Sequence, residues 1–215
     1  MRNKLIRLAA LTALTLATPA LAQSTGSIRI GAHRGFWNCD EASHTENSIA
    51  SLRTAQEYGL WGSEFDVHLT SDDVVVVHHD AHIQGKDIQK NTYGSLKQYK
   101  LANGETMPTL DEYLTQAEGC STTVLVLEFK SQYSKEREDK LVDIALKQLK
   151  EHGLYDPSRV MFISFSINIC KKLAAEAPEF TNQYLNGDIA PSVLKKDGIN
   201  GIDYHYSVFY KHPEW

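Results

Sequence analysis

Residues 63–69 carry the clearest hydrophobic pattern of the chain, and it predicts a β-strand. Polar and apolar side chains alternate there with a period of two, as strands require. Residues two apart on a strand share a face, so Glu64, Asp66 and His68 point one way and the apolar residues between them the other. Neighbouring acids repel each other unless water screens them or a cation lies between them. The face is therefore either a solvated strand surface or a cation site.

The residues that follow this strand favour the second interpretation. Residues 71–73 predict a tight turn, and the four valines at 74–77 predict the return strand of a hairpin. That return strand would bring His78, His79 and Asp80 beside the acidic pair. Carboxylates and imidazoles that converge at the end of a buried strand indicate a metal-assisted acid–base site.

Strand and helix patterns alternate along the rest of the chain. Strands are predicted at 28–32, 123–130, 160–164, 182–185 and 199–203. Helices are predicted at 46–58, 110–118, 134–152, 167–175 and 191–195, and the start of another at 208–215. Thr45 and Thr109 are the expected N-caps of the first two helices.

This alternation predicts a parallel α/β sheet. The nearly continuous apolar run at 123–130 is typical of a strand that is buried on both faces. Six strand–helix units can be counted, whereas a closed barrel of this type has eight strands. Residues 80–108 are polar and weakly patterned, so we expect an insertion there.

The first 22 residues predict a secretory signal peptide. A basic segment precedes a short apolar run at 8–17, and a small-residue cleavage site follows at 20–22. The run is shorter than the roughly 20 residues that span a bilayer. We therefore expect a secreted or periplasmic protein with no transmembrane segment after cleavage, and a single domain over 23–215.

Charge and cysteine content narrow the function further. Loss of the signal peptide would leave 19 basic and 27 acidic residues, a net charge of −8, which argues against nucleic acid as a partner. Cys39, Cys120 and Cys170 are odd in number and far apart, so no disulfide framework is indicated. We expect them to be small buried hydrophobic residues.

The candidate functional residues follow the predicted parallel strands, where α/β barrels place their active sites. They are His33, Arg34, Glu64, Asp66, His79, Glu128 and Lys130. Hard oxygen ligands such as the three carboxylates select Mg²⁺ or Ca²⁺. Arg and Lys can hold a phosphate, although a structural ion pair is the alternative for both. Histidines can transfer protons near neutral pH. Hydrolysis of a phosphodiester needs all three functions.

Six short motifs in this order resemble the glycerophosphodiester phosphodiesterase family. They are Gly-Ala-His33-Arg34-Gly35, Thr-Glu46-Asn47-Ser48, Glu64-Phe-Asp66-Val, Val-Val-His-His79-Asp80, Met-Pro108-Thr109-Leu110-Asp-Glu and Leu-Glu128-Phe-Lys130. The resemblance implies a TIM (β/α)8-type barrel, here truncated after about six strands, with a small insertion after the second strand.

The resemblance also implies roles for single residues. His33 and His79 would be the acid–base pair, and Glu64, Asp66 and Glu128 would bind one divalent cation, Mg²⁺ or Ca²⁺. Arg34 and Lys130 would contact the phosphate of a glycerophosphodiester, which is hydrolysed to an alcohol and glycerol 3-phosphate. Glu46 and Asn47 would cap the first helix or support the site.

Two other functions remain open from the sequence. A truncated barrel could be a non-catalytic module that binds phosphate or a headgroup. Alternatively, the chain could be a phosphodiesterase that acts on lysophospholipids, as a lysophospholipase D does. Turnover separates the first alternative from an enzyme, and the preferred substrate separates the second.

Overall fold

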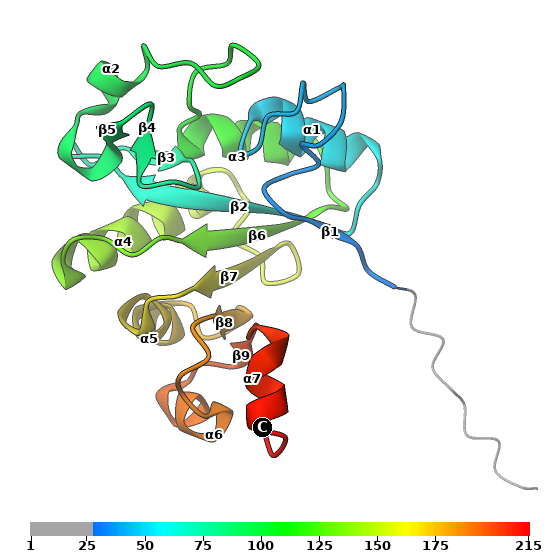
Figure 1. Cartoon of the computed structure of the whole chain (residues 1–215), viewed down its shortest axis with the longest axis vertical. Helices are drawn as coiled ribbons and strands as arrows, with labels where there is room; N and C mark the ends of the chain where they lie inside the picture. Colours follow the sequence, from blue (N-terminus) through cyan, green and yellow to red (C-terminus); the bar gives the residue numbers. More distant parts are fainter. Residues whose placement is uncertain (1–27) are drawn as a thin grey trace, which may run out of the picture.

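A curved sheet of six parallel strands forms the centre of the molecule (Figure 1). The structure is a computed structural model and describes residues 28–215, so the predicted signal peptide at 1–22 lies outside the described residues. In spatial order the parallel strands are β1 (Gly31–Ala32), β2 (Gly62–Leu69), β6 (Val124–Phe129), β7 (Val160–Ser164), β8 (Asn182–Tyr184) and β9 (Gly201–Ile202). The short strand β3 (Val75–Val77) pairs with β2 in the antiparallel sense and completes the predicted hairpin.

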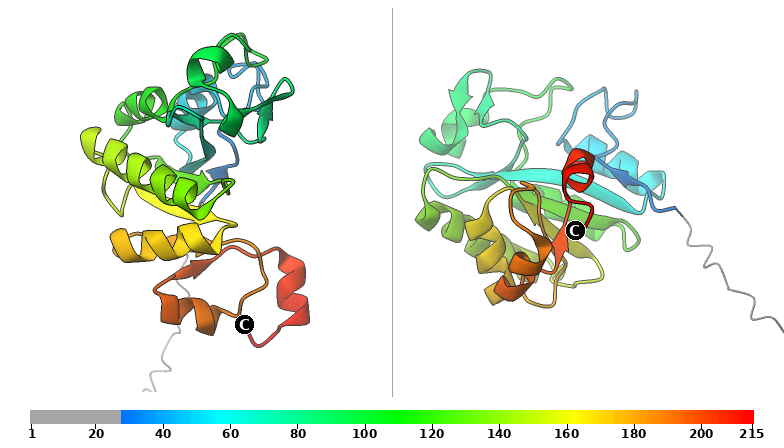
Figure 2. Two further views of the ribbon diagram at one scale, coloured as in Figure 1. Left: turned by 90° about the vertical axis from the view of Figure 1, so that its left-hand side faces the viewer. Right: turned by 60° about the horizontal axis from the view of Figure 1, so that its bottom comes forward.

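Helices connect these strands as the alternating pattern predicts. They are α1 (Ile49–Glu57), α3 (Leu110–Glu118), α4 (Lys135–Glu151), α5 (Ile167–Glu176), α6 (Pro191–Leu194), the 3-10 turn η2 (Lys195–Asp197) and α7 (Tyr206–Lys211). Figure 2 shows α4 and α5 on one side of the sheet and α7 on the other. The sheet is curled into a half-barrel, which confirms the predicted fold class. Within residues 28–215 it is open between β9 and β1.

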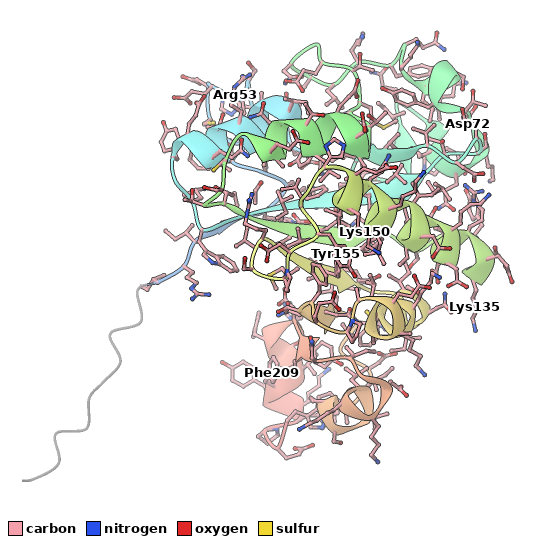
Figure 3. All side chains as sticks on the ribbon, turned by 180° about the vertical axis from the view of Figure 1, so that it is seen from behind. Arg53, Asp72, Lys135, Lys150, Tyr155 and Phe209 are labelled. Carbon is pink, nitrogen blue, oxygen red and sulfur yellow. The ribbon has the colours of Figure 1, made fainter. Side chains whose placement is uncertain are left out.

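The main hydrophobic core lies between the sheet and the helices on its convex side. Phe65, Val67 and Leu69 on β2 have no exposed surface and pack with apolar residues of β6, β7 and the helices. On the solvent side of this layer, Lys150 lies 4.5 Å over the ring of Tyr155 (Figure 3). The alternate residues of the same strands face the concave side, where the candidate site lies.

The insertion is a small satellite beside the sheet, between β3 and α3. Its elements are β4 (His82–Ile83), β5 (Lys86–Asp87), the 3-10 turn η1 (Ile88–Lys90) and α2 (Tyr93–Leu96). It has a hydrophobic cluster of its own, formed by Val76, Ile83, Ile88, Leu96 and Met107.

Two side chains fasten this insertion to neighbouring loops. The Glu105 carboxylate accepts hydrogen bonds from the backbone N–H groups of Ile49 (2.8 Å) and Ala50 (3.2 Å), at the start of α1. Gln89 donates to the Ser131 carbonyl (3.3 Å) and accepts from the Tyr133 N–H (2.9 Å), in the loop after β6. The insertion is therefore bound to two segments that adjoin the candidate site.

Local details differ from the sequence prediction in three places. Ser48, not Thr45, caps α1: the Ser48 side chain accepts from the Ser51 N–H at 3.0 Å. The first strand has only two residues, and β9 is equally short. Among the cysteines only Cys170 is buried, so the expectation of three buried thiols is wrong for the other two.

No helix between residues 28 and 215 combines the length and the apolar character that crossing a membrane requires.

Candidate active site

Three carboxylates meet on the concave face of the sheet. Glu64 and Asp66 lie on β2, and the parallel register places Glu128 of β6 opposite Asp66. One oxygen from each group lies within 4.8 Å of the others. Asp66 is 1% exposed and Glu128 is 6% exposed, so water screens their mutual repulsion poorly.

This burial changes the protonation of the cluster. Burial, and then the charge of Asp66, raise the pKa of Glu64, while burial raises the pKa of Glu128 against the opposing effect of Lys130. Glu64 Oε1 is buried and has no hydrogen-bond partner within residues 28–215. Acidic oxygen donors that are close together, buried and incompletely partnered suit a hard divalent cation. The three side chains could therefore hold one metal ion.

Lys130 provides part of the positive charge that the cluster needs. Its Nζ donates to Glu128 Oε1 at 2.6 Å and forms an ion pair with Asp66 Oδ1 at 2.7 Å. Burial alone would lower the pKa of Lys130, but the charges of Asp66 and Glu128 outweigh it and raise that pKa. One ammonium group faces three carboxylates, so an excess of negative charge remains when all are ionised.

The loop after β1 reaches the cluster through its backbone. The Arg34 N–H donates to Glu64 Oε2 at 2.7 Å, and the Arg34 guanidinium donates to Glu46 at 2.9 Å. Gly35 has φ = 79°, and a Cβ at that position would lie 2.3 Å from Ser51 Oγ. Only glycine fits there, because both the left-handed backbone and the contact with α1 exclude a side chain.

Two histidines flank the carboxylates. His33 Nε2 lies 3.9 Å from Glu64 Oε2, and burial together with the Arg34 charge lowers the pKa of His33. His79 follows the hairpin, and its Nδ1 lies 2.7 Å from Asp80 Oδ1. The contact with Asp80 leaves His79 Nε2 as the ring nitrogen available to a substrate.

Both imidazoles line one cavity of about 650 Å³ on the concave face. Glu64, Glu128 and Lys130 line the same cavity. Its remaining wall is largely apolar and comes from inward-facing residues of the strands and their following loops: Val126, Met161, Ile163, Phe165 and Leu185. The arrangement thus combines proton-transfer groups, a cationic side chain and a possible metal site in one cleft.

Glu46 and Asn47 do not cap α1, because Ser48 does. Asn47 is fully buried and holds Asp66 at two points. Its Nδ2 donates to Asp66 Oδ2 at 2.8 Å, and its Oδ1 accepts from the Asp66 N–H at 3.1 Å. Glu46 instead pairs with Arg34. Both residues thus support the site rather than begin the helix.

Six of the seven predicted site residues line one cleft, and the seventh, Asp66, contacts Lys130 of that lining. Sequence reasoning missed some of their neighbours. Asp80, which the sequence predicts beside the acidic pair, also contacts the His79 ring: its Oδ1 lies 2.7 Å from His79 Nδ1. The apolar wall could have been found by taking the residues of β6 and β7 that alternate with the outer core. Asp203 lines the cavity, whereas His205 is exposed and caps α7.

Comparisons with known proteins agree with this geometry. A sequence model of the glycerophosphoryl diester phosphodiesterase family matches residues 33–196. A glycerophosphodiester phosphodiesterase from Parabacteroides distasonis superposes with a TM-score of 0.82 and 43% identity, covering 87% of this chain and 77% of that one. A phosphodiesterase from Oleispira antarctica, solved with the product sn-glycerol-3-phosphate, superposes with a TM-score of 0.67 and 27% sequence identity. The match covers 85% of this chain and 76% of that one.

A shorter match links the chain to a mammalian enzyme. It is 48% identical over 52 residues to a human glycerophosphocholine phosphodiesterase, which is 22% of this chain and 8% of the human protein. The chain therefore matches only a small part of that relative's length. The family match, in contrast, extends from the loop after β1 to η2. Of the residues that line the cleft, only Gly31 and Asp203 lie outside it. The chain belongs to the glycerophosphoryl diester phosphodiesterase family.

Proposed function

We propose that the protein hydrolyses glycerophosphodiesters to an alcohol and glycerol 3-phosphate with the help of one divalent cation, Mg²⁺ or Ca²⁺. The observation that carries the proposal is the buried carboxylate cluster between two histidines, in which Glu64 Oε1 has no hydrogen-bond partner from the described part of the chain. Family membership and the product complex of the Oleispira antarctica relative support the choice of substrate.

Glu64, Asp66 and Glu128 would hold the cation. When bound, such an ion polarises a phosphate oxygen and makes a nearby hydroxyl or water more acidic. Asn47 would keep Asp66 in the orientation that it has in the structure, through its two hydrogen bonds. The same carboxylates, without a cation, would repel a phosphate ester.

His33 and His79 would carry out the two proton transfers. One imidazole accepts the proton of the attacking hydroxyl as the new P–O bond forms. Attack by water gives glycerol 3-phosphate directly, whereas attack by the substrate's own glycerol hydroxyl gives a cyclic phosphate, which a water molecule then opens to glycerol 3-phosphate. The other imidazole donates a proton to the alkoxide oxygen as the P–O bond to the alcohol breaks. Arg34 and Lys130 line the same cleft, so their charges would attract and orient the phosphate.

The direct test is release of glycerol 3-phosphate from glycerophosphocholine by the purified chain. We expect turnover with Mg²⁺ or Ca²⁺, loss of turnover with EDTA, and loss in Glu64→Ala. The matched control is Glu57→Ala, because Glu57 is an exposed acid at the far end of α1. Absence of product with either ion, or full activity in Glu64→Ala, would contradict the proposal.

Two outcomes of this assay would instead support one of the two alternative functions. Saturable binding of glycerol 3-phosphate without turnover would indicate a non-catalytic phosphate-binding protein. Faster release of choline from lysophosphatidylcholine than from glycerophosphocholine would indicate a lysophospholipase D-like enzyme.

We also propose a secreted or periplasmic location, which rests on the predicted signal peptide at 1–22. Expression of the full chain in a Gram-negative host, followed by fractionation and N-terminal sequencing, tests it. A protein that keeps Met1 and stays with the cytoplasmic fraction would contradict this location.

A further inference from the structure

His68 is the third inward-facing polar residue of β2, after Glu64 and Asp66. It is 3% exposed, and its Nε2 lies 3.2 Å from the carbonyl oxygen of His79. No role in binding a cation follows from its position, because the cluster that could hold one contains Glu64, Asp66 and Glu128 and not His68. What His68 contacts is the main chain of a predicted catalytic residue.

This contact lies where the hairpin ladder ends. Strand pairing runs to Val67 opposite Val77, and the His78 N–H still donates to the Asp66 carbonyl at 3.0 Å. One residue later, the bond from His68 is the one hydrogen bond that ties the His79 main chain to β2 within the described part of the chain. Beyond it, the His79 ring is held by Asp80, whose side chain is 75% exposed. Among the described residues, a buried imidazole thus makes the last hydrogen bond between β2 and the main chain that carries His79.

His68 makes this bond at a cost to the fold. A neutral imidazole carries one N–H and one acceptor nitrogen. If Nε2 donates to the His79 carbonyl, Nδ1 must be the acceptor, and among residues 28–215 the buried Nδ1 has no hydrogen-bond partner. An unsatisfied buried polar atom destabilises the folded state, whereas an apolar side chain of similar size would avoid this cost. The hydrogen bond is what distinguishes histidine from leucine here.

We propose that His68 is a positioning residue for His79: its Nε2–H holds the His79 carbonyl, and so fixes the main chain from which the His79 imidazole reaches the carboxylate cleft. The inference deepens the proposed function and rests on it, because it assumes that His79 transfers a proton. His68 itself touches neither substrate nor cation.

The experiment compares His68→Leu with His68→Gln. Leucine has similar bulk but no donor, whereas the glutamine Nε2 can donate from nearly the same place. For glycerophosphocholine we expect kcat to fall about 10–100-fold in His68→Leu with KM nearly unchanged, and His68→Gln to recover most of the loss. The melting temperature of His68→Leu should equal or exceed that of the wild type, because the unpartnered Nδ1 is gone. His152→Leu, far from the cleft at the C-terminal end of α4, is the control for activity.

A second readout does not require turnover. In protein labelled with ¹⁵N-histidine, the ring signals of His79, assigned by their loss in His79→Gln, should be shifted or broadened in His68→Leu and restored in His68→Gln. If the wild type shows no turnover, the proposed function fails, and this readout alone decides the role of His68.

Two results would overturn the inference. One is a wild-type kcat, or unchanged His79 ring signals, in His68→Leu. The other is a melting temperature that falls in both variants together with activity, since that outcome would make His68 a structural residue.

Discussion

The two faces of strand β2 differ in chemistry: one is apolar and the other is charged. On the convex face, Phe65, Val67 and Leu69 are fully buried among apolar side chains. On the concave face, Glu64 and Asp66 are buried among other charges, and one oxygen of each finds no hydrogen-bond partner within residues 28–215. Adjacent residues of one strand thus meet opposite environments.

This difference separates stability from function within a single element. Burial of apolar side chains supplies most of the free energy that keeps the sheet folded. Buried like charges oppose folding unless a cation or a proton compensates them. The concave face therefore lowers the stability of the fold but forms the candidate active site. Removing a buried side chain from the convex face should lower the free energy of unfolding, whereas neutralising a buried charge on the concave face should raise it.

The largest expected effect is on activity, in Glu64→Gln. We expect turnover to fall by about 10³-fold or more, because a cation ligand is lost. Because the pKa of Glu64 is raised in the fold, its ionised form destabilises the folded state above that pKa. Without added cation at pH 9, Glu64→Gln should therefore melt at a higher temperature than the wild type. Activity assays and thermal melts measure both quantities, and a lower melting temperature would break the contrast between the faces.

Phe65→Ala tests the convex face. Phe65 stacks against Tyr113 with ring centroids 4.4 Å apart, and both are fully buried. We expect a loss of about 3–5 kcal/mol in the free energy of unfolding, because a cavity opens in the core. Urea denaturation measures the loss, and Phe65→Leu should cost much less. The KM of the remaining folded fraction should stay near that of the wild type.

Asn47→Ala tests the concave face without changing its charge, because it removes a neutral amide that holds the Asp66 carboxylate. Two hydrogen bonds to Asp66 are lost, and one of them leaves the buried Asp66 N–H unpaired. We expect turnover to fall about 10–100-fold and apparent cation affinity to weaken by a similar factor. Activity measured against Mg²⁺ concentration tests this. An unchanged cation dependence would show that Asp66 keeps its orientation without Asn47.

The smallest effect concerns an ion pair outside both faces. His152 Nδ1 lies 2.6 Å from Glu118 and its Nε2 lies 3.0 Å from Asp111. Burial alone would lower the pKa of His152, but the hydrogen bonds to Asp111 and Glu118 raise it. The stabilisation is therefore complete below the unfolded pKa of about 6.5 and is lost as pH rises through the higher folded pKa.

His152→Leu checks this pH dependence by urea denaturation. It should cost roughly 0.5–1 kcal/mol at pH 5.5 and less at pH 9, because both acids are partly exposed. Equal costs at the two pH values would mean that packing of the ring, and not its charge, matters.

Much of the fold could be predicted from sequence because its signals are local. Thr109 caps α3 as predicted, and the period-two alternation located β2. The predicted position of the α1 cap was wrong because Asn47 has a left-handed backbone (φ = 51°) and its side chain binds Asp66, 19 residues away, so the helix begins after it. Ser48 then begins the helix, and Glu105 adds a cap from the insertion. Hydrogen bonds between residues so far apart in the chain cannot be predicted from local sequence patterns.

In the candidate site, too, local patterns could be predicted from the sequence, whereas contacts between distant side chains could not. The period of two and the parallel register are enough to bring Glu64, Asp66 and Glu128 together. They do not show that Lys130 would lie on two of these carboxylates, or that His68 would bind a main-chain carbonyl. Those contacts depend on side-chain conformations and on the exact residue at which each strand ends. The sequence pattern does not determine either of them.

The fastening of the insertion has a consequence for protein engineering. Its two anchors, Glu105 on the start of α1 and Gln89 on the loop after β6, adjoin the segments that carry Asn47 and Lys130. A loop exchange intended to retune substrate choice must therefore transplant both anchors with the new segment. A graft that omits Glu105 would loosen the start of α1 next to Asn47, and a graft that omits Gln89 would loosen the loop that follows Lys130, although every acid and imidazole of the site would still be present.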